Sequence, residues 1–351
     1  MLFLCGCGVK NNTTEITFSS WGSKTEVEII KNVIADFEAE NPQIKVNFIH
    51  IPQNYFQKLH LLFASNTEPD VIFLNNLYLP IYANAGRLME LSPDNTIYEE
   101  KVLKTLSWKG KNYAIPRDIS LLVLYYTKDL FKKAGLNNPQ SEWTLNEMLD
   151  YALKIKQETG AFGISFDEDT LFYLPYLMSE GNFDLKNSNE ICEKLKFYSD
   201  LRHKYNVAPK REQSASATMA QMFLQQKLAI ILSGRWLTPK FKEEADFNWD
   251  ITTFPYGENG SRVSLDASGW AISASTKHKE EAQKFINFIS SKQTIEKFAK
   301  TGLLIPARHD VILEDAGAYY KALENAIPTP VTVDYNKTLD NLKQSLEICA
   351  F

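Results

Sequence analysis

The segment Pro69-Asp70-Val71-Ile72-Phe73-Leu74-Asn75-Asn76 decides the fold class. Its four consecutive apolar residues follow a Pro-Asp turn, and such a short continuous run is typical of a central strand covered on both faces. Upstream, residues 16–18 and 44–48 alternate apolar and polar side chains as strands do, while residues 27–37 repeat at helical spacing until Asn41-Pro42. A second helix is expected over 55–64. Alternating strands and helices predict an α/β unit with a largely parallel sheet.

The same rhythm restarts after residue 120. Thr144-Leu145-Asn146-Glu147 is a capping box that begins a helix reaching about residue 157. We also expect strands over 121–126, 162–166, 229–232 and 251–254, a long helix over 188–205 and a further helix over 336–346. The stretch 264–306 contains one strand (270–272) and two helices (279–290 and 293–300), too little for an independent domain. We therefore expect it to return and complete the first sheet.

Length and charge restrict the class of protein. The chain has 351 residues, which corresponds to two domains of about 150 residues each. With 38 Lys and Arg against 43 Asp and Glu it carries a net charge of −5 and no basic run, so it lacks the electrostatic footprint of a nucleic-acid binder. No stretch approaches the ~20 apolar residues of a membrane span. The 21 Phe, 16 Tyr and 6 Trp supply more flat apolar faces than a core needs.

The cysteines give one localisation signal. Leu4-Cys5-Gly6-Cys7 has the order of a bacterial lipoprotein cleavage box, and the polar residues 8–14 read as a tether, so Cys7 is predicted to carry a lipid. A chance cysteine pair at a chain end is the alternative. Cys192 and Cys349 have no Cys-x-x-Cys spacing, which argues against zinc and thioredoxin-type sites. The four cysteines form no framework, and Cys192 is interpreted as a small buried hydrophobic residue.

Seven short motifs, spread along the chain, carry a resemblance to a known family. They are Ile16-Thr17-Phe18-Ser19-Ser20-Trp21-Gly22, Phe37-Glu38-Ala39-Glu40-Asn41-Pro42, Glu68-Pro69-Asp70-Val71-Ile72, Tyr113–Ile119 followed by Leu124–Gly135, Gly234-Arg235-Trp236, Gly269–Ser273 and Gly302–Arg308. With this pattern the sequence resembles the extracellular solute-binding protein family 1, the carbohydrate-binding lipoproteins and periplasmic proteins of bacterial ABC importers, to which maltose-binding protein belongs.

The resemblance implies a two-lobed α/β fold of the periplasmic-binding-protein type (type II), each lobe a mostly parallel sheet flanked by helices. Residues 1–13 would be a lipoprotein signal remnant and tether. Residues 14–117 with 264–308 would form the N-terminal lobe, and 118–263 with 309–351 the C-terminal lobe. Only six residues precede Cys7, and the family usually continues past the 336–346 helix. We therefore expect a chain shortened at both ends, with a C-terminal lobe that lacks a packing helix.

The implied function is capture of a sugar or oligosaccharide between the lobes by hinge closure, followed by delivery to a membrane permease. The protein would be exported, lipid-anchored to the cell membrane, facing the periplasm or exterior, and monomeric. It would need no cofactor or metal and would not be an enzyme. Aromatic rings bury the apolar face of a sugar, while Asp, Asn and Arg side chains satisfy its hydroxyls.

Candidate ligand-binding residues follow from motif positions. Trp236, at a strand-to-helix turn, and Trp270, with its neighbour Gly269, are predicted to stack on the sugar, unless both pack in the core. Trp21, Asn75 and Asn76 lie at the ends of strands, where ligands gather in α/β sheets, although the two asparagines also suit a plain turn. Asp118 is expected to accept sugar hydroxyls with Arg117 orienting it, the alternative being an interlobe ion pair. Weaker candidates are Tyr173, Asp266 and Arg308, the last two also suited to hinge salt bridges.

Three alternatives remain. A carbohydrate-active enzyme would use paired carboxylates, but Asp167-Glu168-Asp169 are adjacent residues that do not converge on one bond, and a solvated loop is expected there. The same fold could bind a non-sugar solute such as ferric iron, a polyamine or glycerol phosphate. Tyr125-Tyr126 and Tyr319-Tyr320 resemble the paired tyrosines of iron binders, although neighbours on a strand point to opposite faces, which splits the first pair between core and cleft. The third alternative is a degenerate, non-binding remnant.

Overall fold

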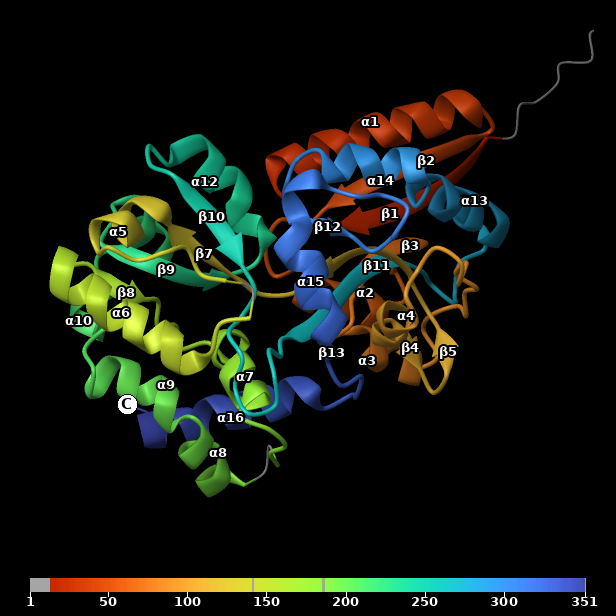
Figure 1. The fold of residues 1–351 in the computed structure, drawn as a ribbon. Coiled ribbons are helices and arrows are strands. Elements are labelled where there is room, and N and C mark those ends of the chain that lie inside the picture. Colours follow the sequence, from red (N-terminus) through yellow and green to blue (C-terminus); the bar gives the residue numbers. More distant parts are fainter. Residues whose placement is uncertain (1–12, 141, 185–186, 351) are drawn as a thin grey trace, which may run out of the picture.

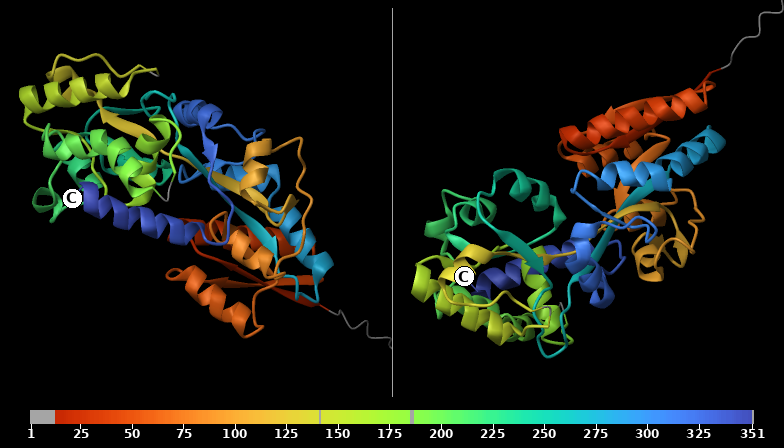
Figure 2. Two further views of the ribbon diagram at one scale, coloured as in Figure 1. Left: turned by 90° about the horizontal axis from the view of Figure 1, so that it is seen from below. Right: turned by 45° about the horizontal axis from the view of Figure 1, so that its top comes forward.

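The computed structural model describes residues 13–140, 142–184 and 187–350. The chain forms two bodies joined at a narrow waist, each with its own sheet (Figures 1 and 2). We call the body around the larger sheet the first lobe and the body around the four-stranded sheet the second lobe. Cys7 and the predicted signal remnant lie outside the described residues, apart from Thr13.

The larger sheet has the order β12-β6-β11-β3-β1-β2, with β13 paired to β11. Its strands are β1 (Thr14–Ser20), β2 (Ile44–His50), β3 (Val71–Asn75), β6 (Ile115–Ser120), β11 (Ser264–Ile272), β12 (Ile305–Pro306) and β13 (Ile327–Pro328). The helices around it are α1 (Lys24–Glu40), α2 (Tyr55–Ala64), α3 (Leu79–Asn84), α4 (Glu100–Thr105), α13 (Lys279–Ile289) and α14 (Lys292–Ala299). A small hairpin, β4 (Ser107–Trp108) and β5 (Lys111–Asn112), lies beside α3.

The second sheet has the order β10-β7-β9-β8. Its strands are β7 (Val123–Thr127), β8 (Phe162–Ile164), β9 (Leu228–Ser233) and β10 (Trp249–Thr252). Its helices are α5 (Lys128–Lys133), α6 (Leu145–Thr159), α7 (Thr170–Ser179), α8 (Ser188–Lys194), α9 (Lys196–His203), α10 (Arg211–Ser214), α11 (Met219–Leu224) and α12 (Thr238–Glu244), with a 3-10 turn, η1 (Arg235–Leu237). Later in the chain come a second 3-10 turn, η2 (Glu314–Ala316), and helices α15 (Gly317–Asn325) and α16 (Tyr335–Ala350).

Both sheets are mixed rather than mostly parallel. In the first lobe β1 runs parallel to β2 and β3, but β11 is antiparallel to β3 and β6. In the second lobe β8 is parallel to β9, whereas β7 is antiparallel to β9 and β10. The antiparallel pairs of the first sheet involve β11, which returns from the other lobe, and the short β12, which pairs with β6. No βαβ crossover forces these strands to run parallel.

Local sequence signals account for most elements. The capping box at Thr144 is present, since Thr144 Oγ1 accepts the amide of Glu147 and the Glu147 carboxylate accepts the amide of Thr144. The helix predicted over 188–205 is instead divided at Leu195 into α8 and α9. Cys192 on α8 is disulfide-bonded, so its interpretation as a small buried hydrophobic residue was wrong. A spacing rule could not show this, because a disulfide depends on where the tertiary fold places each helix.

Aromatic side chains dominate both cores. In the first lobe Phe18 of β1 and Phe37 of α1 pack on Phe285 of α13, with ring centroids 5.3 and 5.2 Å apart. In the second, Tyr125 of β7 packs on Phe241 of α12 at 5.2 Å. Most of the aromatic residues are therefore used in cores, and each lobe is held together internally.

The chain passes between the lobes at residues 121–122, at 253–263 and again before α16, which packs on α7, α8 and α9 (Figure 2). Two details differ from the predicted division. The boundary after residue 117 falls inside β6, whose pairing with β11 continues to Ser120. Within the segment predicted for the second lobe, β13 pairs with β11 of the larger sheet. A pairing between segments more than 60 residues apart leaves no local pattern from which to predict it.

Candidate ligand-binding site between the lobes

A pocket of about 490 Å³ lies where the lobes meet. From the first lobe it is lined by residues that follow β3 and by the start of β11; from the second by the start of α7; and from the final segment by the first turns of α16. The lining residues are Leu77, Tyr78, Asp169, Thr170, Leu171, Leu174, Ser264, Asp266, Thr329, Tyr335, Leu339, Asp340 and Lys343. We call this the interlobe pocket.

The first-lobe side of the pocket lies at the carboxyl ends of parallel strands, where open α/β sheets bind ligands. Asn76 follows β3 and is buried. Its side-chain Nδ2 donates to Asp266 Oδ1 at 2.8 Å, and its Oδ1 accepts the Ala267 amide at 3.2 Å. Asn76 is therefore a structural link between β3 and β11 that holds the Asp266 carboxylate in place. Burial raises the pKa of Asp266, although hydrogen bonds from Thr329 and Asn76 oppose the rise.

Asp266, one of the weaker candidates, lines the interlobe pocket, and its contact with a ligand stays a prediction. Asn75 has a smaller role in the turn, because its Oδ1 accepts the amide of Tyr78 at 3.2 Å. That contact begins the turn that presents Tyr78 to the pocket. Tyr78 was not predicted from the sequence. It lies only three residues after β3, so the expectation that ligands gather at the ends of strands would have included it.

Tyr78 is one end of an aromatic row along the first lobe. Its ring stacks on Phe56 of α2 with centroids 3.7 Å apart and planes 8° from parallel. Phe56 in turn contacts Trp21, at 5.3 Å, and Trp21 also packs on Phe73 at 4.3 Å. All three rings of the row, Trp21, Phe56 and Tyr78, are half-buried. Tyr78 is the member of the row that lines the interlobe pocket.

Arg117 and Asp118 form an ion pair within the first lobe. Arg117 is buried, its Nε donates to Asp118 Oδ1, and its guanidinium lies over the Phe73 ring at 4.1 Å. A second acidic partner, Glu26 of α1, lies 3.4 Å away. Burial raises the pKa of Asp118 despite the adjacent Arg117 charge. Neither residue lines the interlobe pocket. Both residues belong to β6, so the pair does not bridge the lobes, and its contact with a sugar stays a prediction.

Two predicted sugar-stacking residues are in the cores. Trp270 is 1% exposed and lies between Phe73 and Phe298, because β11 is a central strand with packed groups on both faces. Tyr173 is fully buried in α7, with its hydroxyl donating to Thr170 Oγ1 at 3.1 Å. As sites of stacking on a ligand, both predictions were wrong, since neither ring is open to solvent.

Gly269 and Arg308 also have structural roles. A Cβ at Gly269 would lie 2.2 Å from the carbonyl oxygen of Ile115, at a bulge between β11 and β6, so the close approach of the two strands requires glycine. Arg308 donates two hydrogen bonds to the Asp310 carboxylate, at 2.9 and 2.8 Å, and one to the Ser290 carbonyl at 3.0 Å. Neither lines the interlobe pocket.

Trp236 is 40% exposed, just beyond the end of β9. Its ring covers Gly234, where a Cβ would lie 1.9 Å from the indole. Ser233, the last residue of β9, pairs with Val123, the first residue of β7 and the first after the 121–122 crossing. Trp236 is therefore an exposed ring on the side of the second lobe near the waist, although it does not line the pocket.

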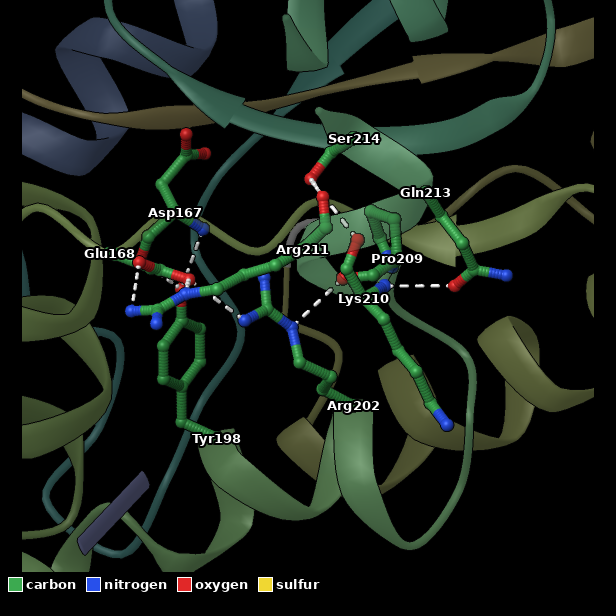
Figure 3. Close-up of polar contacts among 9 residues, drawn as sticks. All are labelled: Asp167, Glu168, Tyr198, Arg202, Pro209, Lys210, Arg211, Gln213 and Ser214. Atoms are coloured by element: carbon green, nitrogen blue, oxygen red, sulfur yellow. Dashed lines mark hydrogen bonds and ion pairs between the residues drawn. The ribbon is translucent and has the colours of Figure 1, made fainter. Parts of the chain in front are cut away.

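The second-lobe side of the pocket is held by a network of ion pairs (Figure 3). Arg211 donates to both oxygens of Glu168, at 2.7 and 2.6 Å, and Arg202 donates to Oε1 at 3.0 Å. The Tyr198 hydroxyl donates to the Asp167 carbonyl at 2.7 Å and accepts its amide at 2.9 Å. These contacts anchor the loop between β8 and α7. A simply solvated loop had been expected there. Its anchoring positions Asp169 and Leu171 at the pocket.

Asp167 projects from the same loop without joining the Glu168 ion pairs (Figure 3). Burial and the neighbouring carboxylates of Asp169 and Glu168 raise its pKa to about 6, against a smaller opposite effect from Arg202. The pKa of Glu168 is lowered, chiefly by its hydrogen bond with Arg211. Adjacent carboxylates therefore have opposite shifts, set by which of them the arginines contact.

The paired tyrosines do not form an open site. Tyr125 and Tyr319 hydroxyls lie 2.6 Å apart, both residues are fully buried, and Tyr125 also hydrogen-bonds Thr238 and the Gly234 carbonyl. Burial raises the pKa of both phenols, which disfavours the phenolate that a ferric ion requires. Tyr126 is also buried, so the expectation that this pair divides between core and cleft was wrong. Across the described ranges, no three His, Cys, Asp or Glu side chains converge in a way that could hold a metal ion.

Two sheet-based lobes with a ligand-sized pocket between them define a two-lobed solute-binding fold. Solved structures share it: a substrate-binding protein of Listeria monocytogenes in complex with cycloalternan aligns with a TM-score of 0.82 and 24% identity, over 96% of this chain and 94% of that one. The sugar-binding protein MalE of Xanthomonas citri aligns with a TM-score of 0.81 and 24% identity, over 96% and 97%. The predicted two-lobed α/β fold is thereby confirmed.

The sequence model of the family of bacterial extracellular solute-binding proteins matches residues 21–296, and the chain belongs to this family. The maltodextrin-binding protein of Bacillus subtilis is 27% identical over 338 residues, covering 88% of this chain and 78% of the relative. The galactooligosaccharide-binding protein of the same organism is 26% identical, covering 86% and 75%. The family resemblance of the seven motifs is thus confirmed. In the part of the chain that the structure describes, no helix has the length and apolar character needed to cross a bilayer.

Proposed function

We propose that this protein is the substrate-binding component of a bacterial ABC importer, capturing a sugar or oligosaccharide in the interlobe pocket and delivering it to a membrane permease. The observation that carries the proposal is a pocket lined from both lobes by an aromatic ring, Tyr78, and by carboxylates, Asp169 and Asp266. The names of the Bacillus subtilis relatives, which bind maltodextrin and galactooligosaccharide, support it.

The chemistry of the pocket suits a saccharide. Tyr78 presents a ring already fixed by its stack on Phe56, so little side-chain entropy is lost when a sugar face packs on it. Asp266 is held by Asn76, so it accepts hydrogen bonds from ligand hydroxyl groups in a fixed direction. A buried hydroxyl or carboxylate left without a partner costs about 1–3 kcal/mol, so these groups discriminate between sugars by their hydroxyl pattern.

Closure follows from the division of the pocket between two bodies. Only in a closed arrangement do both Tyr78 and the α7 residues contact one ligand, so the ligand favours that arrangement. The segments at 121–122 and 253–263 are the connections that would bend. We propose the lobes mainly as predicted, with β13 in the first lobe and the segment between β13 and α16 as a third connection. Trp236 and Trp21 are proposed as further ring contacts on the two sides of the closed pocket.

Binding without catalysis is part of the proposal, with no cofactor or metal involved. The Asp169 carboxylate accepts the Leu171 amide at 3.0 Å as the cap of α7, and Asp266 is hydrogen-bonded by Asn76 and Thr329. Carboxylates held in this way suit recognition of hydroxyls better than proton transfer. The proposed partners are a carbohydrate and the permease subunits, with the protein itself a monomer and no nucleic acid or resident prosthetic group involved.

The proposed location is outside the cell membrane, anchored by a lipid on Cys7. The disulfide of Cys192 supports export, because disulfides persist in oxidising compartments and are rare in the bacterial cytosol. A diacylated or triacylated cysteine gives stable attachment, and attachment raises the effective concentration of the protein near its permease.

A thermal-shift screen with mono- and oligosaccharides tests the function. At least one saccharide should raise the melting temperature, and Tyr78→Ala should weaken its affinity by tenfold or more, because the stacking face is lost. Leu153→Ala, an exposed change on α6, is the matched control and should leave the affinity unchanged. A folded protein that no carbohydrate stabilises would overturn the proposal.

A further inference from the structure

A second cavity opens directly beside the interlobe pocket. Its volume is about 370 Å³, and it shares Leu174, Ser264, Thr329 and Tyr335 with that pocket. Its remaining lining residues are Met178, Gly181, Asn182, Phe183, Asn259, Ile327, Pro328 and Pro330. We call it the apolar recess. Because the two spaces share these four residues, a ligand bound between the lobes could extend from one into the other.

One face of helix α7 connects the two spaces. Leu171 and Leu174 line the interlobe pocket, and Leu174 and Met178 line the apolar recess, at the three- and four-residue spacing of a single helix face. Another wall is the segment 327–330, which includes β13 of the first-lobe sheet and leads to Tyr335. The recess is therefore a continuation of the same site and not a separate surface hollow.

The two spaces differ in chemistry. The interlobe pocket carries Asp169, Asp266, Asp340 and Lys343, whereas the recess carries no charged side chain among its lining residues. Two of its polar side chains are used within the protein: Asn259 Nδ2 donates to the Met178 carbonyl at 3.1 Å, and Thr329 hydrogen-bonds Asp266. Its other polar side chains are those of Asn182, Ser264 and Tyr335. A sugar ring placed there would leave several hydroxyls without partners, at about 1–3 kcal/mol each.

An apolar group has the opposite balance. It loses no hydrogen bond on entering and gains about 25 cal/mol for each Å² of apolar surface removed from water. An apolar cavity of about 150 Å³ is enough to hold a benzene ring. The recess therefore has room for an aromatic ring or a short alkyl chain linked to a saccharide in the adjoining pocket.

We propose that the apolar recess is a subsite for an aglycone, so that this protein binds glycosides carrying an aryl or alkyl group in preference to the free saccharides. This inference rests on the proposed function, since the glycosyl part occupies the interlobe pocket. Met178 and Phe183 are the residues that select the apolar group, because both are partly exposed to the recess and neither lines the interlobe pocket.

Isothermal titration with matched ligand pairs tests the proposal. The pairs are maltose, maltotriose, lactose and cellobiose, each against its p-nitrophenyl glycoside. For the saccharide that binds, the glycoside should have a Kd at least tenfold lower. Met178→Asn and Phe183→Asn should each remove most of that gain while leaving the Kd of the free saccharide within twofold, and Leu153→Asn should change neither.

The outcomes separate the subsite from the function. Equal affinity of a free saccharide and its glycoside, or a gain that survives both variants, overturns the subsite and leaves the proposed function standing. Binding of a glycoside alone, lost in Met178→Asn, supports both. If no member of any pair binds the folded protein, both proposals fail together.

Discussion

Asp167 and Glu168 are neighbours with opposite electrostatic environments. The pKa of Asp167 is raised to about 6 from 3.8, so its protonated form favours the folded state. That contribution is complete below pH 3.8 and is lost as the pH rises through about 6. Glu168 has a lowered pKa through Arg211 and Arg202, so its contribution is present at neutral pH and is lost on acidification.

Asp167→Asn should accordingly stabilise the protein at pH 7, by up to about 3 kcal/mol, and the gain should disappear near pH 4. Urea unfolding at a series of pH values measures it. Glu168→Gln is the control of opposite sign and should destabilise at pH 7, because it removes the charge that Arg202 and Arg211 contact. A stability gain that is constant from pH 4 to pH 7 would contradict the assigned environment of Asp167.

Trp270 and Trp236 were both predicted to stack on a sugar, but they lie in different environments, 1% and 40% exposed. Trp270→Ala should reduce the free energy of unfolding by about 3–5 kcal/mol, since it leaves a cavity between Phe73 and Phe298. Trp236→Ala should reduce the free energy of unfolding by clearly less. Denaturant titration of the two variants compares them directly. Equal losses would show that Trp270 is not part of the core.

At the scale of elements, the contact between β11 and β6 decides one residue identity. Gly269→Ala would bring a Cβ within 2.2 Å of the Ile115 carbonyl oxygen, and backbone of a central sheet has no room to move away. The substitution should destabilise by about 1–3 kcal/mol. Gly317→Ala, at the start of α15 with no atom within 4 Å of the added Cβ, should be neutral or slightly stabilising. Calorimetric melting compares the stabilities of the two variants. Equal melting temperatures would show that β11 and β6 can move apart to accept the added Cβ.

Element positions were largely predictable because helices and strands follow local rules. The capping box at Thr144, the Asn-Pro after α1 and the apolar run of β3 each mark an element within a residue or two. The break at Leu195 was not predictable, since the apolar periodicity continues through it and the turn is set by how α8 and α9 pack.

For the whole molecule, hinge closure predicts a change in shape on binding. A saccharide at 100 times its Kd should raise the free energy of unfolding by about 2.7 kcal/mol. Small-angle X-ray scattering should show a smaller radius of gyration in the same solution, because both lobes then contact one ligand. Tyr78→Ala, which removes a ring from the pocket and should raise the Kd at least tenfold, should be stabilised by no more than about 1.4 kcal/mol at that ligand concentration. Stabilisation by a saccharide with an unchanged radius would contradict closure.

The sequence by itself determined the strand and helix rhythm and the family, because these follow from periodicity and short motifs. The tertiary structure decided which aromatic rings are open. Trp270 and Tyr173 have the same local signals as ligand-facing rings. Trp270 is buried because packed groups cover both faces of β11, and Tyr173 is buried because α7 is packed against its neighbours. Tyr78 is presented by a turn, and Asn76 meets Asp266 across 190 residues of chain. Exposure depends on such distant partners, which local sequence patterns do not record.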